Sequence, residues 1–125
     1  MPTLNIVKGE AKSWIFEFIE SNLLDNTQLS LLGASILFVV RSAEPAPTVT
    51  DDSAALILES TANGGITIID ATHFELDIPK AATYTLTTPT SPLPYGIKAI
   101  LAGKTDPTDI DEGLFNLIDS TVRGI

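Results

Sequence analysis

The sequence predicts an all-β domain in which two sheets stack as a sandwich. Residues 63–79 contain a Gly-Gly turn signal, two short strand-like runs and a terminal proline, a pattern typical of a β-hairpin. The second run alternates between apolar and polar residues, so one face is buried and the other faces water. The apolar residues are Phe74, Leu76 and Ile78, and the polar residues are His73, Glu75 and Asp77. Similar short runs recur between turn signals along the chain.

The length and the composition suit one compact domain spanning residues 1–125. A chain of 125 residues buries roughly two-thirds of its unfolded surface. Apolar residues make up 44% of the chain but aromatic residues only 6%, so the core is mostly aliphatic. This composition fills a sandwich core and leaves apolar surface for a partner. We therefore expect the domain to be buried in an assembly; a well-packed monomer is the alternative.

The first strands are expected at residues 4–7 and 13–19, with a turn at residues 8–10 between them. Residues 13–19 place three aromatic side chains on one face: Trp14, Phe16 and Phe18. An amphipathic helix over residues 10–24 is the alternative. The aromatic spacing of two favours the strand, and core packing is favoured over a sugar-stacking platform for this aromatic row.

The next strand, over residues 34–41, is apolar on both faces. Ile36, Phe38 and Val40 lie on one face, and Leu37 and Val39 lie on the other. Such a strand is central in its sheet, or its outer face is covered. Residues 42–53 are expected to form an exposed loop, residues 54–59 a short strand, and residues 66–78 the hairpin.

The C-terminal part is expected to hold two further strands. Residues 80–93 predict at most one short extended piece and a Pro-rich crossover. Residues 95–102 predict a strand, residues 103–112 an acidic loop, residues 113–119 the last strand with Phe115 and Leu117 inward, and residues 121–125 a tail. No convincing helix is found. Seven or eight short antiparallel strands fit an immunoglobulin-like β-sandwich.

Charge and composition exclude several classes of function. The net charge is −9, and the seven basic residues are scattered, which disfavours nucleic-acid binding and attraction to an anionic membrane. The uncharged run over residues 26–40 is too short and too polar to span a bilayer. Cysteine is absent, so disulfides and thiolate metal sites are excluded. We also expect no secretory signal, and folding in a cytoplasm.

No constellation of catalytic residues stands out. His73 is the only histidine, and it is interpreted as a solvated strand residue; a small enzyme using His73 with Glu75 or Asp77 is the alternative. The acidic stretch 106–113 is interpreted as a solvated connector, with an adventitious divalent site as the alternative. The hydroxyl of Tyr95 is expected to bind a neighbouring loop. We predict no catalytic residue, no metal site and no cofactor.

Contact with a partner is predicted at two apolar features of the chain. One is the outer face of the two-sided strand, and the other is the tail, with burial inside the domain as the alternative for both. The residues assigned to partner contact are Leu37, Val39, Val122 and Ile125.

Several blocks in order also resemble one known family. They are residues 30–36, Phe38-Val39-Val40-Arg41, Ala55-Leu56-Ile57, residues 63–68, residues 74–79, Tyr95-Gly96-Ile97-Lys98 and residues 121–125. Together they resemble the immunoglobulin-like domain at the start of tailed-phage baseplate upper proteins, which is shared by small prophage virion proteins. The chain departs from this pattern at residues 87–94, at residues 105–112 and around Ala71-Thr72.

The resemblance implies a non-enzymatic structural protein of a tailed-phage virion, assembled in the cytoplasm of the bacterial host. It would dock through its sandwich into a symmetric tail or baseplate. The implied partners are other phage structural proteins and identical copies, in a homotrimer or homohexamer, without nucleic acid or membrane. A capsid decoration protein or a host-surface or glycan adhesion domain is the alternative.

Overall fold

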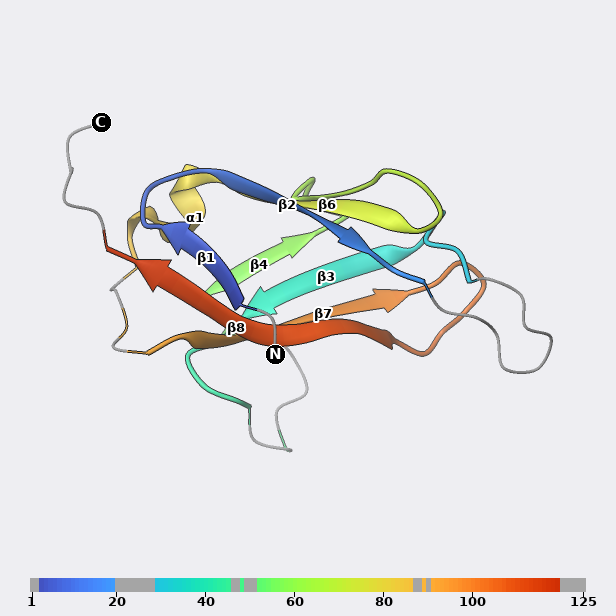
Figure 1. The fold of residues 1–125 in the computed structure, drawn as a ribbon. Coiled ribbons are helices and arrows are strands. Elements are labelled where there is room, and N and C mark those ends of the chain that lie inside the picture. Colours follow the sequence, from blue (N-terminus) through green and yellow to red (C-terminus); the bar gives the residue numbers. More distant parts are fainter. Residues whose placement is uncertain are drawn as a thin grey trace.

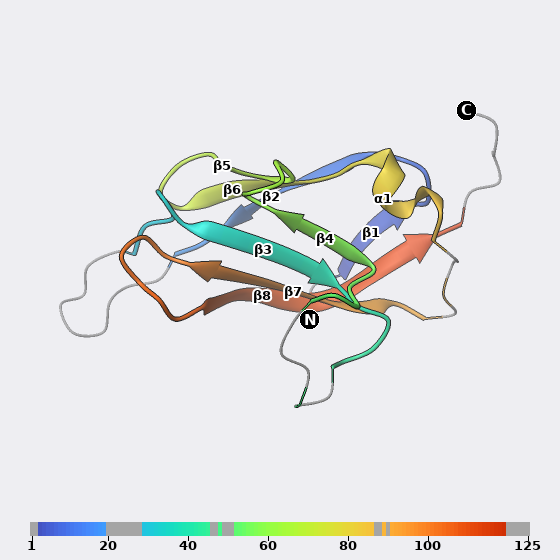
Figure 2. The same ribbon diagram turned by 180° about the vertical axis from the view of Figure 1, so that it is seen from behind.

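Eight strands and one short helix form the fold in a computed structural model, which describes residues 3–19, 29–45, 48, 52–86, 89 and 91–119. The elements are β1 (Thr3–Val7), β2 (Lys12–Glu17), β3 (Ser35–Val40), β4 (Ile57–Ser60), β5 (Ile66–Ile68), β6 (His73–Ile78), α1 (Lys80–Tyr84), β7 (Leu93–Ile100) and β8 (Thr108–Ile118). The larger sheet has the order β1-β8-β7-β3-β4, and the smaller has the order β2-β6-β5. Figures 1 and 2 show the two sheets stacked as layers.

This strand order is that of an immunoglobulin-like sandwich, as predicted. The second, fifth and sixth strands form one sheet, and the third, fourth, seventh and eighth lie in the other, in the manner of a variable-type domain. The expectation of purely antiparallel strands was wrong for one pair, because β1 runs parallel to β8. These two strands come from opposite ends of the chain, so no tight hairpin fixes their relative direction.

The core fills the space between the two sheets. Phe38, Phe74 and Phe115 are fully buried, and the ring of Phe38 lies 5.6 Å from that of Tyr95 and 6.2 Å from that of Phe115. The predicted hairpin is confirmed, because β5 pairs with β6 in antiparallel register. The apolar residues of β6 all face this core.

The strand prediction for residues 13–19 is confirmed for β2, so the helix alternative was wrong there. Phe18 is buried, and Trp14 and Phe16 are partly buried against the core. The ring of Phe16 stacks on that of Phe74, with 5.2 Å between ring centroids. The aromatic row is therefore mostly core, as predicted.

The absence of a helix was predicted wrongly, because α1 follows Pro79. Pro79 has an extended backbone before the first turn, and Ala81 and Ala82 are strong helix formers. Thr83 is fully buried, and its Oγ1 accepts a hydrogen bond from Gly9 N at 3.0 Å. Because isolated helices of this length are unstable, this tertiary contact holds the turn.

The acidic loop over residues 103–112 was also predicted wrongly in its second half. Strand β8 begins at Thr108 and pairs with β7, with a register irregularity between Ile97 and Lys98. Cross-strand contacts stabilise the acidic residues: Lys98 Nζ lies 3.6 Å from Asp109 Oδ1.

The fourth strand spans Ile57–Ser60, whereas the sequence predicted residues 54–59. In the predicted loop over residues 42–53, the described residues belong to no helix or strand.

Candidate docking surface on the larger sheet

The candidate site lies on the outer face of the larger sheet, where β3, β7 and β8 run side by side. Side chains alternate across a strand, so Leu37 and Val39 point away from the core while their neighbours Ile36 and Phe38 are buried. Strand β3 is an inner strand of the sheet, with β7 on one side and the edge strand β4 on the other. The register places Val39 opposite Gly96 of β7.

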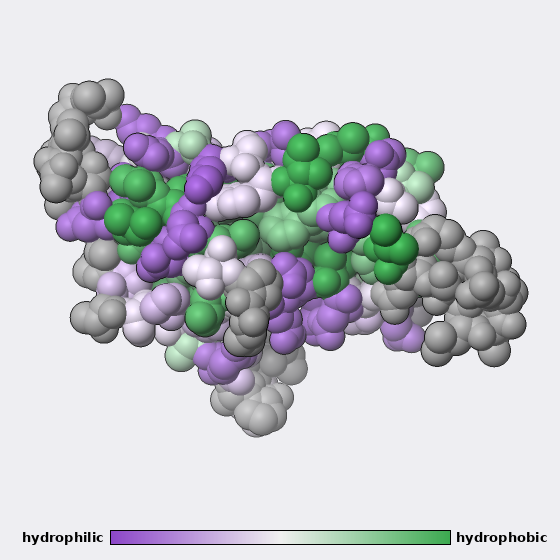
Figure 3. Space-filling model, in the orientation of Figure 1, coloured by the Kyte–Doolittle hydropathy of each residue, from purple (hydrophilic) through white to green (hydrophobic). Residues whose placement is uncertain are grey.

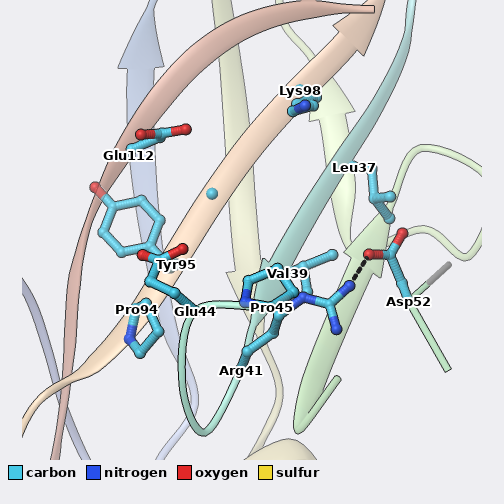
Figure 4. Close-up of a pocket in the computed structure, with 11 residues that line it drawn as sticks. Leu37, Val39, Arg41, Glu44, Pro45, Asp52, Pro94, Tyr95, Lys98 and Glu112 are labelled. Carbon is cyan, nitrogen blue, oxygen red and sulfur yellow. Dashed lines mark hydrogen bonds and ion pairs between the residues drawn. The ribbon is translucent and has the colours of Figure 1, made fainter. Parts of the chain in front are cut away.

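A hollow of about 380 Å³ occupies this face, and Figure 4 shows its lining side chains. Its floor is Gly96, where an added Cβ would meet no atom within 4 Å. Leu37 and Val39 line one side and are only half-buried. The missing side chain at Gly96 thus creates a depression bordered by apolar side chains.

Charged groups of both signs border the hollow. The guanidinium of Arg41 lies 2.5 Å from Asp52 Oδ1, and this pair fixes the chain beyond β3 to the loop before β4. Lys98, Glu44 and Glu112 also line the hollow. An apolar centre with a polar rim is the usual anatomy of a protein–protein interface.

Tyr95 supports the hollow from below. Its side chain is buried, and its hydroxyl donates a 2.8 Å hydrogen bond to Asp111 Oδ2. Burial first, and this hydrogen bond second, raise the pKa of Tyr95 well above its ordinary value. The expected tie of this hydroxyl exists, but its partner belongs to strand β8 rather than to a loop.

His73 lies on the opposite sheet and contacts carboxylates other than those predicted. Its Nδ1 donates to Asp70 Oδ1 at 2.9 Å, and its Nε2 lies 3.2 Å from Glu17 Oε2. The hydrogen bond to Asp70, and then the charges of Asp70 and Glu17, raise the pKa of His73. Asp77 instead accepts a hydrogen bond from Ser13. With a carboxylate at each ring nitrogen, the charged imidazolium is favoured, which is poorly suited to act as a general base.

The acidic residues of the last strand do not gather. In the part of the chain that the structure describes, no three His, Asp or Glu side chains converge as metal ligands would. Asp109 contacts Lys98, whereas Asp111 contacts Tyr95. The sequence suggested an acidic cluster because these carboxylates are close together in the sequence and were assigned to a single loop.

Of the four residues assigned to partner contact, the structure brings Leu37 and Val39 together in the hollow. Val122 and Ile125 lie outside the described residues. Gly96 could not be recognised as the floor from the sequence, since only the strand register places it opposite Val39. No described helix has the length and apolarity required to cross a membrane.

Comparison with known proteins does not indicate a function, so the function is argued from the residues described above. No protein-family model matches the chain, and a search of curated proteins finds no match either.

Proposed function

We propose that the protein is a non-enzymatic structural protein of a tailed-phage virion, and that it docks into a symmetric tail or baseplate assembly through the outer face of its larger sheet. The observation that carries the docking is the hollow over Gly96, where Leu37 and Val39 remain half-exposed on an inner strand of a five-stranded sheet. The phage setting rests on the sequence blocks that resemble baseplate upper proteins.

The shape and chemistry of this face support binding rather than catalysis. An apolar centre gains free energy when a partner covers it, at roughly 25 cal/mol per Å² of buried apolar area. The rim charges, such as Lys98 and Glu112, give orientation and selectivity more than affinity. Repeated around a ring, weak individual contacts become stable.

The first test is the mass of the purified chain by sedimentation velocity over a range of concentrations. We expect a homotrimer or homohexamer, and we expect Val39→Asp to reduce the mass by placing a charge in the hollow. Ile69→Asp is the matched control, because Ile69 is 51% exposed beside the other sheet. A wild-type chain that stays monomeric at every concentration contradicts self-assembly through this face.

A second variant covers the case in which Val39→Asp fails to fold. A Cβ added at Gly96 would meet no atom within 4 Å, so we expect Gly96→Leu to retain the fold while its side chain fills the hollow. We expect the same loss of assembly. The genes beside this one provide an independent check: tail and baseplate genes support the phage setting, capsid genes support the decoration role, and their absence contradicts both.

A further inference from the structure

We infer that the outer edge of β2 is a second, separate interface, at which a second copy of this chain adds its own β2 in antiparallel orientation about a two-fold axis centred on Ile15. This interface goes beyond the proposed function, because it lies in the smaller sheet and uses the backbone rather than the hollow.

The hydrogen-bond pattern shows which backbone groups of β2 point outward. Phe18 N donates to Thr72 O at 2.6 Å, and continuing the β2–β6 register by one residue beyond Glu17 and His73 places these two residues opposite each other. In an antiparallel pair, residues alternate between bonding the partner strand and facing away from it. Trp14 and Phe16 therefore bond β6, whereas the N–H and C=O groups of Ser13, Ile15 and Glu17 point to the outer edge.

Nothing among the described residues pairs with that edge. Strand β2 ends the smaller sheet, whose order is β2-β6-β5. Figure 1 is viewed from the flank on which this edge lies, and β2 recedes in the reverse view of Figure 2. An unpaired edge strand is a template for another strand.

Two of the other sheet edges, by contrast, are capped by side chains. On β4, Asn63 Nδ2 donates to Leu58 O at 3.3 Å and Asn63 Oδ1 accepts from Ser60 N at 3.0 Å. On β1, Lys12 Nζ donates to Asn5 O at 2.8 Å. Strand β5 has only three residues. Covering and shortness are usual means of blocking strand addition; β2 has six residues, and within the described part of the chain no side chain caps its outer edge.

The side chains of β2 are complementary to a second copy of themselves. A two-fold axis at Ile15 pairs Ile15 with Ile15 and Ser13 with Glu17, so all three outward-facing residues exchange backbone hydrogen bonds. Other registers that pair these same outward residues leave at least one of them without a partner. Ile15 is 64% exposed, and Figure 3 shows hydrophobic side chains gathered along β2 toward its C-terminal end.

The same axis also covers the half-buried aromatic side chains on the inner face. It places Trp14 of each copy opposite Phe16 of the other copy. Both pairs are of the non-hydrogen-bonded type, in which the opposed residues of an antiparallel ladder lie closer together. Aromatic cross-strand pairs of this kind stabilise sheets. Both sides of β2 therefore gain apolar contacts in one register.

The test uses two substitutions at Ile15 and one matched control. Ile15→Pro removes an outward N–H while sparing the bonds to β6, which an edge strand tolerates. Ile15→Lys places a charge on the edge, and Ile69→Lys is the matched control. In sedimentation velocity, we expect both Ile15 variants to halve the mass of the wild-type assembly, a hexamer falling to a trimer or a dimer to a monomer. We expect Ile69→Lys to leave it unchanged.

A spin label gives the register without relying on these variants. Because the chain has no cysteine, Ile15→Cys carries one nitroxide, and directly opposed residues have Cα atoms about 5.5 Å apart. We expect strong dipolar broadening from a label at residue 15 and none from Ile69→Cys.

Three outcomes overturn the inference: a wild-type homotrimer, which cannot contain a two-fold pair, a wild-type mass unaffected by both Ile15 variants, or no broadening at residue 15. One outcome supports this edge and contradicts the proposed ring. It is a wild-type dimer that dissociates in the Ile15→Lys variant but stays intact in the Val39→Asp variant. Assembly lost with Val39→Asp and retained with both Ile15 variants supports docking through the hollow and overturns the edge.

Discussion

At the scale of single residues, His73 joins the end of β2 to the turn before β6. It is held between Asp70 and Glu17, and Glu17 is its directly opposed residue on β2. The hydrogen bond from Thr72 N, followed by the one from His73, lowers the pKa of Asp70 to about 2. Ionised Asp70 and protonated His73 thus stabilise each other in the folded state.

The sign of this pH dependence follows from the two pKa shifts. The pKa of His73 is raised from 6.5, so its contribution to stability is full below pH 6.5 and is lost as pH rises through the folded pKa. The pKa of Asp70 is lowered from 3.8 to about 2, so its contribution is full above pH 3.8 and is lost as pH falls toward 2. We expect the stability difference between wild type and His73→Gln to peak between these limits, measured by urea unfolding.

NMR reports this titration directly, because the chain has one histidine. We expect a His73 pKa above 6.5 that returns toward that value in Asp70→Asn. Glu75→Gln is the matched control and should leave the pKa in place. A wild-type pKa at or below 6.5 contradicts the arrangement.

Glu59 and Gly65 form a second residue-scale contact, at the inner face of β4. Glu59 is buried, and burial, with the charge of Asp77 second, raises its pKa. A Cβ added at Gly65 would lie 2.8 Å from Glu59 Cβ and still closer to its carboxylate. The glycine is therefore required by the close approach of the buried glutamate.

We expect Gly65→Ala to reduce the free energy of unfolding by about 1–3 kcal/mol, the usual range for overpacking. In a Glu59→Ala background the same change should cost less, with a coupling energy of at least about 0.5 kcal/mol. Gly96→Ala is the matched control, since its Cβ meets open space, and it should change stability by less than about 0.5 kcal/mol. Equal costs for Gly65→Ala in the two backgrounds would show that Glu59 is not the obstacle.

At the scale of elements, strands with strict alternation were predictable and the exceptions have physical causes. Strand β6 was predicted because a buried and a wet face leave a period of two in the sequence. Helix α1 was missed because its stability comes from the contact of Thr83 with Gly9, which are far apart in the chain. The start of β8 was missed because its acidic residues are satisfied by Lys98 and Tyr95 of the neighbouring strand.

The candidate site, like the strands, was predictable from the sequence only in part. Leu37 and Val39 could be selected because a strand apolar on both faces must cover its second face. Gly96 and the ion pair of Arg41 with Asp52 could not, since both depend on which strands become neighbours. Periodicity fixes which face a residue occupies but not what lies opposite.

The helix yields a prediction at this scale. Thr83→Val keeps the shape of the side chain but removes the acceptor for Gly9 N, and should cost about 1–3 kcal/mol in the free energy of unfolding. Thr85→Val, at the exposed end of α1, is the matched control and should be nearly neutral. Thermal unfolding of the two variants under identical conditions makes the comparison. Similar losses for both would mean that the buried hydrogen bond does not hold α1.

At the scale of the whole molecule, the first and last described strands lie side by side in one sheet. Strand β1 pairs with β8 from Thr3 to Val7, and Lys8 N continues the pairing with a 2.8 Å bond to Ile118 O. Leu4 and Ile6 are buried in the common core. The larger sheet is therefore complete only when the first and last strands are both in place, which makes folding depend on contacts between distant residues.

This closure predicts that β1 unfolds with the rest of the domain and does not fray independently. Ile6 is 1% exposed, so Ile6→Ala should reduce the free energy of unfolding by about 2–5 kcal/mol, a large part of the stability of a domain this size. Thr3→Ala, at an exposed position of the same strand, is the matched control and should change stability by less than about 0.5 kcal/mol. Urea unfolding measures the free energy of unfolding of both variants, and we expect the dependence of that free energy on urea concentration to be unchanged. If Ile6→Ala costs less than about 1 kcal/mol, β1 is only loosely attached, since a buried isoleucine in a cooperative core cannot be truncated so cheaply.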